Sequence, residues 1–144
     1  MKIKKVLIVY KKSSYEQHAL DERDPNYLRL IRERSAATRA SRKIHREHRA
    51  TFESVKRDLK RIGLKFDVRL RYRLKALKRY DLVVTIGGDG TFLETAHYLM
   101  SGINLGGNSV PSESVGYYCR STRHNFRRTI LQLLRRRARL QRLH

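Results

Sequence analysis

Residues 81–100 constrain the fold more than any other part of the chain. They open with a continuous apolar run, residues 82–86, which is typical of a strand buried on both faces. The run leads directly into a glycine-rich turn, Gly87-Gly88-Asp89-Gly90-Thr91. After the turn, four residues recur at the spacing of one helix face: Leu93, Ala96, His97 and Met100. This stretch predicts a buried strand, a tight turn and a helix, which is one unit of an open α/β sheet.

A single carboxylate, Asp89, lies in this turn. Ligands of open α/β sheets bind beyond the carboxyl ends of the strands, and the N–H groups at the amino end of a helix favour phosphate. An acid among phosphate-binding groups fits a proton acceptor for a hydroxyl, a hydrogen-bond acceptor or a metal ligand. The alternative is a plain turn with a solvated Asp, because Gly and Asp are common in turns. The flanking strand and helix favour the phosphate site.

Three further segments are predicted to be strands. Residues 6–10 form a short apolar run that predicts a central strand, and residues 66–72 alternate apolar and charged side chains, as an edge strand does. Residues 74–80 are expected to form a short helical connection. Residues 103–108 predict a strand that ends in Gly-Gly-Asn, where Asn108 would bond either a ligand hydroxyl or its own turn.

Helices are predicted between these strands. Asp24 and Pro25 form a good helix start, and residues 32–43 are either a surface helix or a mobile excursion. Four residues at helical spacing precede Gly63, which suits a helix end: Phe52, Val55, Leu59 and Ile62. Another helix is expected after Asn125, with an apolar face of four residues: Phe126, Ile130, Leu133 and Leu134. The alternation predicts a single α/β domain over residues 1–144, an open, mostly parallel sheet with helices on both faces.

Histidine and cysteine offer few metal ligands. His45 and His48 are three residues apart and could bind a metal, but no third ligand accompanies them, which favours surface histidines. Cys119 is the only cysteine, so the chain has no internal disulfide, and it is expected to be a small buried hydrophobe.

The charge balance is extreme, with 34 Lys and Arg against 13 Asp and Glu and a net charge of +21. This predicts an anionic partner: phosphorylated small molecules, nucleic acid, an anionic surface or an acidic protein. No apolar run is long enough to span a bilayer, and no signal peptide is recognised, so a cytoplasmic location without membrane contact is expected.

Residues 85–93, Thr-Ile-Gly-Gly-Asp-Gly-Thr-Phe-Leu, and residues 105–117, Leu-Gly-Gly-Asn-Ser-Val-Pro-Ser-Glu-Ser-Val-Gly-Tyr, together resemble NAD kinases. The branch that includes the animal mitochondrial enzyme is the most similar, and the insertion that begins near Tyr15 also resembles that branch. The first motif is shared with lipid kinases and phosphofructokinases. The second motif indicates the NAD kinase branch.

The resemblance implies transfer of the γ-phosphoryl group of ATP to the 2′-hydroxyl of the adenosine ribose of NAD, which gives NADP. Asp89 would accept the proton of that hydroxyl. Four residues would shape the phosphate and ribose pocket: Gly87, Gly88, Gly90 and Thr91. Phe92 would lie against the dinucleotide, Asn108 would contact the nucleotide, and Mg²⁺ would accompany ATP.

The sequence departs from the NAD kinase pattern in two ways. Gly107 stands where the family usually has Val, and no segment matches the family's second, β-rich domain with its Asn-Glu/Asp motif. The resemblance therefore implies an amino-terminal domain that needs a β domain or a homo-oligomer partner. Weak or no kinase activity is expected from this chain alone.

Two other functions remain open. One is a lipid or small-molecule kinase of the same superfamily, although the second motif counts against it. The other is a basic nucleic-acid-binding protein on a kinase-derived fold, which the net charge and the Arg-rich residues 135–144 favour. The lack of aromatic residues interleaved with basic ones counts against nucleic acid.

Overall fold

Four parallel strands form one open sheet in the order β2-β1-β3-β4. In the computed structural model, which describes residues 3–77, 79–99, 102–111 and 116–135, these strands are β1 (Val6–Tyr10), β2 (Phe66–Leu70), β3 (Leu82–Gly87) and β4 (Ile103–Asn108). Val6 pairs with Leu82, and Gly87 pairs with Asn108. The predicted central and edge positions of β1 and β2 are confirmed.

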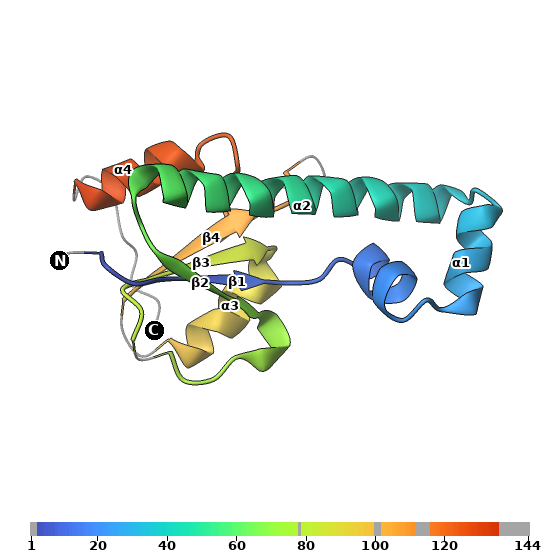
Figure 1. Cartoon of the computed structure of the whole chain (residues 1–144), viewed down its shortest axis with the longest axis horizontal. Coiled ribbons are helices and arrows are strands. Elements are labelled where there is room, and N and C mark those ends of the chain that lie inside the picture. Colours follow the sequence, from blue (N-terminus) through green and yellow to red (C-terminus); the bar gives the residue numbers. More distant parts are fainter. Residues whose placement is uncertain (1–2, 78, 100–101, 112–115, 136–144) are drawn as a thin grey trace.

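Helices cover both faces of the sheet. The long helix α2 (Ala36–Ile62) and α4 (Phe126–Leu134) lie on one face, and α3 (Asp89–Tyr98) lies on the other (Figure 1). A short π-helix, η1 (Glu16–Asp21), and α1 (Pro25–Arg32) precede α2, and a 3₁₀ turn, η2 (Arg71–Arg73), follows β2. The predicted fold class, an open parallel α/β sheet with helices on both faces, is confirmed.

The core consists of two apolar layers, because successive side chains of a strand point to opposite faces. Val6, Ile8 and Tyr10 pack towards α2 and α4. The same layer receives the buried faces of both helices: Phe52, Val55, Leu59, Phe126, Ile130 and Leu133. Leu7 and Val9 point the other way, into a smaller layer. Burial on both faces explains why residues 6–10 and 82–86 are apolar except for Thr85, which is also buried.

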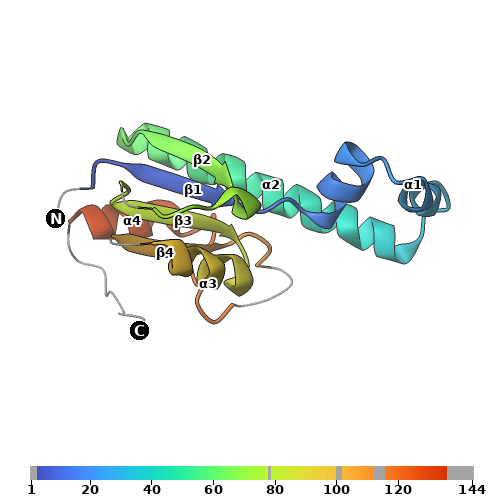
Figure 2. The same cartoon turned by 90° about the horizontal axis from the view of Figure 1, so that it is seen from below.

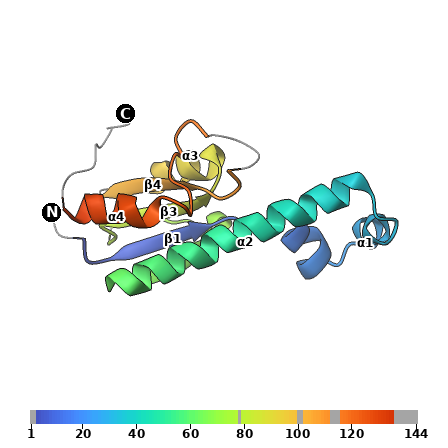
Figure 3. The ribbon, with the colours of Figure 1, turned by 90° about the horizontal axis from the view of Figure 1, so that it is seen from above.

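Local caps define the helix ends. The Asp24 side chain accepts hydrogen bonds from the backbone N–H groups of Asn26 and Tyr27, and Pro25 is the first residue of α1. Ser35 caps α2 in the same way, so residues 36–43 belong to that helix. Gly63 ends α2 with φ of 89°, a conformation that glycine adopts without strain. The first half of α2 extends beyond the sheet together with η1 and α1 (Figures 2 and 3).

The predicted face of α3 was wrong. Leu93 is 40% exposed and His97 is also exposed, whereas the buried residues are Thr91, Phe92 and Thr95. The Thr95 hydroxyl donates to the carbonyl oxygen of Thr91 (2.7 Å), so a polar side chain is buried here without an unpaired group. Packing of Phe92 against β4 decides the orientation of a helix whose apolar pattern is weak.

Other local predictions also fail. The predicted helical connection over residues 74–80 was wrong: the described residues of this stretch form no helix, and Leu77 forms a β-bridge with Leu99. Val68 of β2 is exposed although the alternation placed it inward.

Some predictions lie outside the described residues: Met100, residues 112–115 of the loop, and nearly all of the basic segment after Leu134. Within the described residues, no helix combines the length and apolarity needed to cross a bilayer.

Candidate functional site

The carboxyl ends of β3 and β4 bring the two sequence motifs together. Gly87 and Asn108 are register partners at the end of the β3–β4 ladder, and the backbone N–H of Ser109 donates to the carbonyl oxygen of Gly87 (3.1 Å). The chain after β1 reaches the same edge, where the N–H of Lys11 donates to the carbonyl oxygen of Ile86 (3.4 Å). Parallel strands place their carboxyl ends together, and this is the edge where such sheets bind ligands.

The glycine turn forms the amino end of α3. Gly88 is the N-cap residue, and no atom of the described residues lies within 4 Å of the position that a Cβ would take there. The N–H groups that follow have no acceptor within the helix, since the first turn of any helix lacks one. At Gly87 a Cβ would lie 2.8 Å from the Thr91 hydroxyl, so this position requires glycine. The turn is therefore open to an anion on its Gly88 side.

Arg71 lies beside the start of α3. Its guanidinium donates to the Thr91 hydroxyl (3.2 Å), forms an ion pair with Glu94, and lies 3.8 Å from where a Gly90 Cβ would be. Thr91 itself is buried. Sequence reasoning missed Arg71 because it is one of many arginines. The available signal was its position directly after Leu70, the carboxyl end of β2, which is the same edge of the sheet.

Asp89 points back to the loop that follows β4. Its Oδ2 accepts the backbone N–H of Tyr117 (2.8 Å), and its Oδ1 accepts those of Tyr118 and Cys119 (3.0 Å each). Partial burial acts to raise the pKa of this carboxyl, but the three backbone donors outweigh it and hold the pKa below its usual value. Gly116, with φ of 74°, turns the chain into this arrangement. Asp89 thus fastens the loop to the amino end of α3.

The three aromatic residues of this region differ in exposure: Phe92 is buried, Tyr118 is partly buried and Tyr117 is exposed. Phe92 is buried and stacks on Tyr118, with ring centroids 5.5 Å apart and an interplanar angle of 11°. Tyr117 is 69% exposed and meets Tyr118 edge to face. Tyr118 therefore covers the Phe92 ring, and the contact of Phe92 with a dinucleotide stays a prediction. Tyr117 is the most exposed aromatic side chain of the three.

Asn108 is buried at the end of β4. Its side-chain oxygen accepts the backbone N–H of Val110 (3.2 Å), which closes the turn that carries the second motif. Of the two roles predicted for Asn108, the structure displays the bond to its own turn. A role towards a ligand is not tested by this contact.

His48 was predicted to be a surface histidine, and this was wrong. It is buried against Tyr10, its Nε2 donates to the carbonyl oxygen of Lys11, and its Nδ1 lies 2.6 Å from the Ser109 hydroxyl. Because Nε2 carries the hydrogen, Nδ1 accepts from Ser109. Burial lowers the pKa of His48 to about 4. The signal was available in the sequence: His48 lies on the same helical face as Phe52, Val55 and Leu59.

The polar network around His48 ties α2 to the second motif. The Thr51 hydroxyl donates to the carbonyl oxygen of Ser109 (2.9 Å), and Arg123 donates to the Thr51 hydroxyl (3.3 Å). The Ser13 hydroxyl lies 2.6 Å from Nδ1 of His45. The contacts from His48 and Thr51 hold Ser109, the residue after Asn108, in position at the β4 side of the edge.

The carboxylates at this edge do not provide a Mg²⁺ site. Asp89 is occupied by three N–H donors, and Glu94 is paired with Arg71. Elsewhere, His18, Glu22 and Asp24 place ligand atoms within 4.8 Å of one another. That group is on η1 and before α1, and His18 and Glu22 already bond each other. Within the described part of the edge, the residues therefore do not fit a protein-bound Mg²⁺.

Comparison with models of known protein families finds no match, and no curated protein matches the chain. The similarity to NAD kinases therefore depends on the two quoted motifs and on their meeting at one edge of the sheet.

Proposed function

We propose that this chain binds NAD at the carboxyl edge of its sheet and serves as the α/β domain of an ATP-dependent NAD kinase. The observation that carries the proposal is the open glycine turn at the amino end of α3, with space at Gly88 and the Arg71 guanidinium beside Gly90. Backbone N–H groups at a helix start and a guanidinium are both groups that bind phosphate.

The roles of the residues follow from their places around the turn. The phosphates of the dinucleotide contact the backbone at Gly87, Gly88 and Gly90, with Arg71 as the cation. An aromatic base stacks on the exposed ring of Tyr117, which stands across the turn. Asn108 keeps the neighbouring strand end in the shape that receives the nucleotide.

Asp89 faces the ribose hydroxyl in this proposal. Its pKa is held below the usual range, so the carboxyl is ionised at neutral pH and is a weak base. A weak base suits phosphoryl transfer, because the loose transition state leaves the attacking hydroxyl largely protonated until late and catalysis depends on positioning. Asp89 then orients the hydroxyl through a hydrogen bond to Oδ2, which accepts one backbone N–H whereas Oδ1 accepts two. Any Mg²⁺ would be held by the ATP phosphates, whose charge it would offset, and this edge would supply no ligand to it.

The binding test uses Gly88→Ala. We expect the variant to fold as the parent does, because its φ of −111° suits alanine and no described atom lies close to the added methyl group. The methyl group occupies the space through which a phosphate reaches the backbone, so NAD affinity should fall by about tenfold, or about 1.4 kcal/mol. Isothermal titration with NAD measures the affinity, and thermal unfolding checks the fold. Equal NAD affinity in a folded variant would show that the phosphate does not bind at this turn.

The activity test measures NADP formed from NAD and MgATP, with the chain alone and with a family β domain supplied in trans. Asp89→Asn should abolish the activity that the β domain restores. Because this change also weakens the loop at 117–119, Gly116→Ala serves as the matched control: its Cβ would lie 2.7 Å from the Cys119 carbonyl oxygen and disturbs the loop while leaving the carboxylate. If both variants lose the same activity, Asp89 acts only by holding the loop. Phosphorylation of a lipid with none of NAD would favour the lipid kinase alternative.

A further inference from the structure

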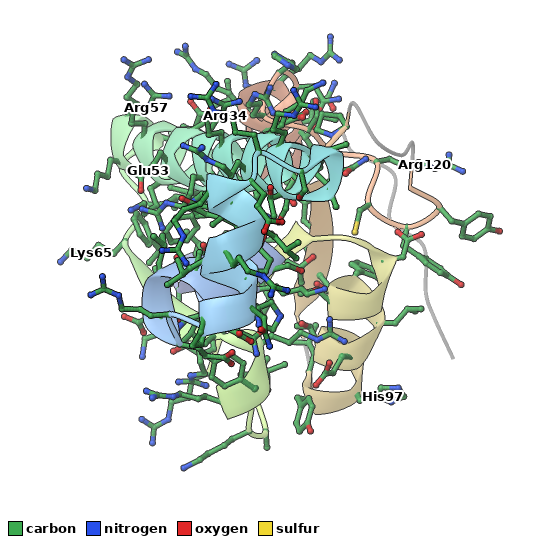
Figure 4. All side chains as sticks on the ribbon, turned by 90° about the vertical axis from the view of Figure 1, so that its right-hand side faces the viewer. Arg34, Glu53, Arg57, Lys65, His97 and Arg120 are labelled. Atoms are coloured by element: carbon green, nitrogen blue, oxygen red, sulfur yellow. The ribbon has the colours of Figure 1, made fainter. Side chains whose placement is uncertain are left out.

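The long helix α2 carries a row of exposed cations. Its sequence contains nine Lys and Arg against three Asp and Glu. Seven of the cations are exposed and have no ion pair within the described part of the chain: Arg39, Arg42, Lys43, Arg46, Arg57, Lys60 and Arg61. They lie away from the buried face of the helix, so the row faces solvent (Figure 4).

Helix α4 lies beside α2 (Figure 3). Its exposed arginines add to the cations of α2. Its outer side borders a hollow of about 510 Å³ lined by residues at helical spacing: His124, Arg127, Arg128, Leu131, Gln132 and Arg135. Its three arginines also have no ion pair with another described residue. We call the exposed cations of α2 together with these α4 residues the α2–α4 face.

The helices on the two faces of the sheet differ in charge. On the α2–α4 face, Glu53 is paired with Arg49 and Lys56, and Glu47 is paired with Arg123, so these acids do not offset the row of exposed cations. On the opposite face, α3 contains two acids and no Lys or Arg. The proposed binding of NAD at the carboxyl edge does not involve the cations of the α2–α4 face, and their clustered positive charge favours an anionic partner.

The dimensions and composition of this face favour a duplex. Arg39 and Arg61 are 22 residues apart on a straight helix, about 33 Å at 1.5 Å per residue, which is close to the 34 Å of one duplex turn. Single-stranded nucleic acid is held by aromatic side chains that stack on its bases. Among the described residues, the only large exposed apolar side chain on α2 or α4 is Leu134, which is aliphatic. The face thus offers charge without a stacking surface.

We propose that the α2–α4 face binds the phosphate backbone of duplex nucleic acid, without regard to base sequence, at a surface separate from the carboxyl edge of the sheet. Phosphate contacts of this kind release counterions, so the affinity falls steeply as the salt concentration rises. Base readout is not part of the proposed interaction, because contacts to phosphate carry no sequence information.

The test is fluorescence anisotropy with a labelled 20-base-pair DNA duplex of mixed sequence, titrated with the full chain between about 50 and 200 mM KCl. The triple variant Arg46→Gln, Arg57→Gln, Arg127→Gln should bind more weakly and reduce the slope of log K against log salt by about 3, one for each lost phosphate contact. Exposed substitutions of this kind alter stability little, within about 0.5 kcal/mol, and thermal unfolding verifies this.

A matched control removes the same charge from the other face. Arg73→Gln, Lys75→Gln, Arg79→Gln changes three exposed cations in the connection between β2 and β3, which packs on the α3 side through Leu74, Leu77 and Tyr80. This variant should keep the salt slope within about 1 of the parent. Saturating NAD should leave duplex binding unchanged.

Four outcomes would overturn the proposal. The first is no salt-dependent binding at 50 mM KCl, and the second is equal weakening by the two triple variants, which would mean diffuse attraction by net charge. The third is competition by NAD, which would place the duplex at the carboxyl edge. The fourth is tighter binding of single strands, of vesicles of anionic lipid or of poly-glutamate than of the duplex, lost in the same α2–α4 variant, which would assign the face to that partner.

Discussion

His48 makes the stability of this protein depend on pH between the ordinary pKa of histidine and the lowered pKa of this residue. Burial lowers its pKa from 6.5 to about 4 in the folded chain. Between these values the unfolded chain takes up a proton that the folded chain does not, so the free energy of unfolding falls as the pH falls. The charged groups that face His48 are Lys11, Arg49 and His45, and all three oppose its protonation.

The size of the effect follows from the two pKa values. A difference of about 2.5 units corresponds to about 3 kcal/mol over the whole transition, of which about 2 kcal/mol is lost between pH 7.5 and pH 5. Burial lowers the pKa of His45 as well, so it adds a smaller loss of the same sign. Glu53, Asp81 and Asp89 have lowered pKa values, and their stabilising effect is lost only as the pH falls below their ordinary values of 4.5 and 3.8. Their contribution to the free energy of unfolding therefore changes little between pH 7.5 and pH 5.

The assay is urea unfolding at pH 7.5 and at pH 5, followed by far-ultraviolet circular dichroism because the chain has no tryptophan. His48→Gln keeps a donor for the Lys11 carbonyl and an acceptor for Ser109 but cannot titrate. It should remove about 2 kcal/mol of the pH dependence. His124→Gln makes the same substitution at an exposed histidine and should leave the pH dependence unchanged. A full decline retained in His48→Gln would refute the assignment to His48.

Three further predictions concern packing and caps. Gly106→Ala would place a Cβ 2.7 Å from the Sγ of Cys119, so it should destabilise the fold by about 1–3 kcal/mol in urea unfolding, and an unchanged midpoint would contradict the close approach. Burial and the nearby Asp89 carboxylate raise the pKa of the Cys119 thiol to about 12, so Ellman's reagent at pH 8 should modify it only after denaturation; rapid modification of the native chain would show that the thiol is accessible. Ser35→Ala removes the bond to the Thr38 N–H and should cost about 1 kcal/mol, whereas Ser35→Asp should retain most of it; equal losses would argue against a capping role.

Much of the fold is predictable from the sequence because each signal is local. The apolar runs at 6–10 and 82–86 can be satisfied only by burial on both faces of a sheet, and parallel neighbours with helical connections provide that. Asp24 with Pro25, and Gly63, mark helix ends through chemistry within a few residues. The meeting of the two glycine motifs also follows, since carboxyl ends of parallel strands share one edge.

Only the tertiary structure decided how the side chains at that edge are used. Asp89 bonds backbone groups 28 to 30 residues away, and His48 meets Ser109 across 61 residues. The neighbouring residues in the sequence do not determine such partners, because they depend on how α2 and the loop after β4 pack against the sheet. The same holds for α3, where burial of Phe92 beneath Tyr118 outweighs a weak apolar pattern and turns Leu93 to the solvent. The periodicity of a sequence indicates which residues favour burial. Which helix face is buried and which distant residues bond each other is determined by the packing of the whole chain.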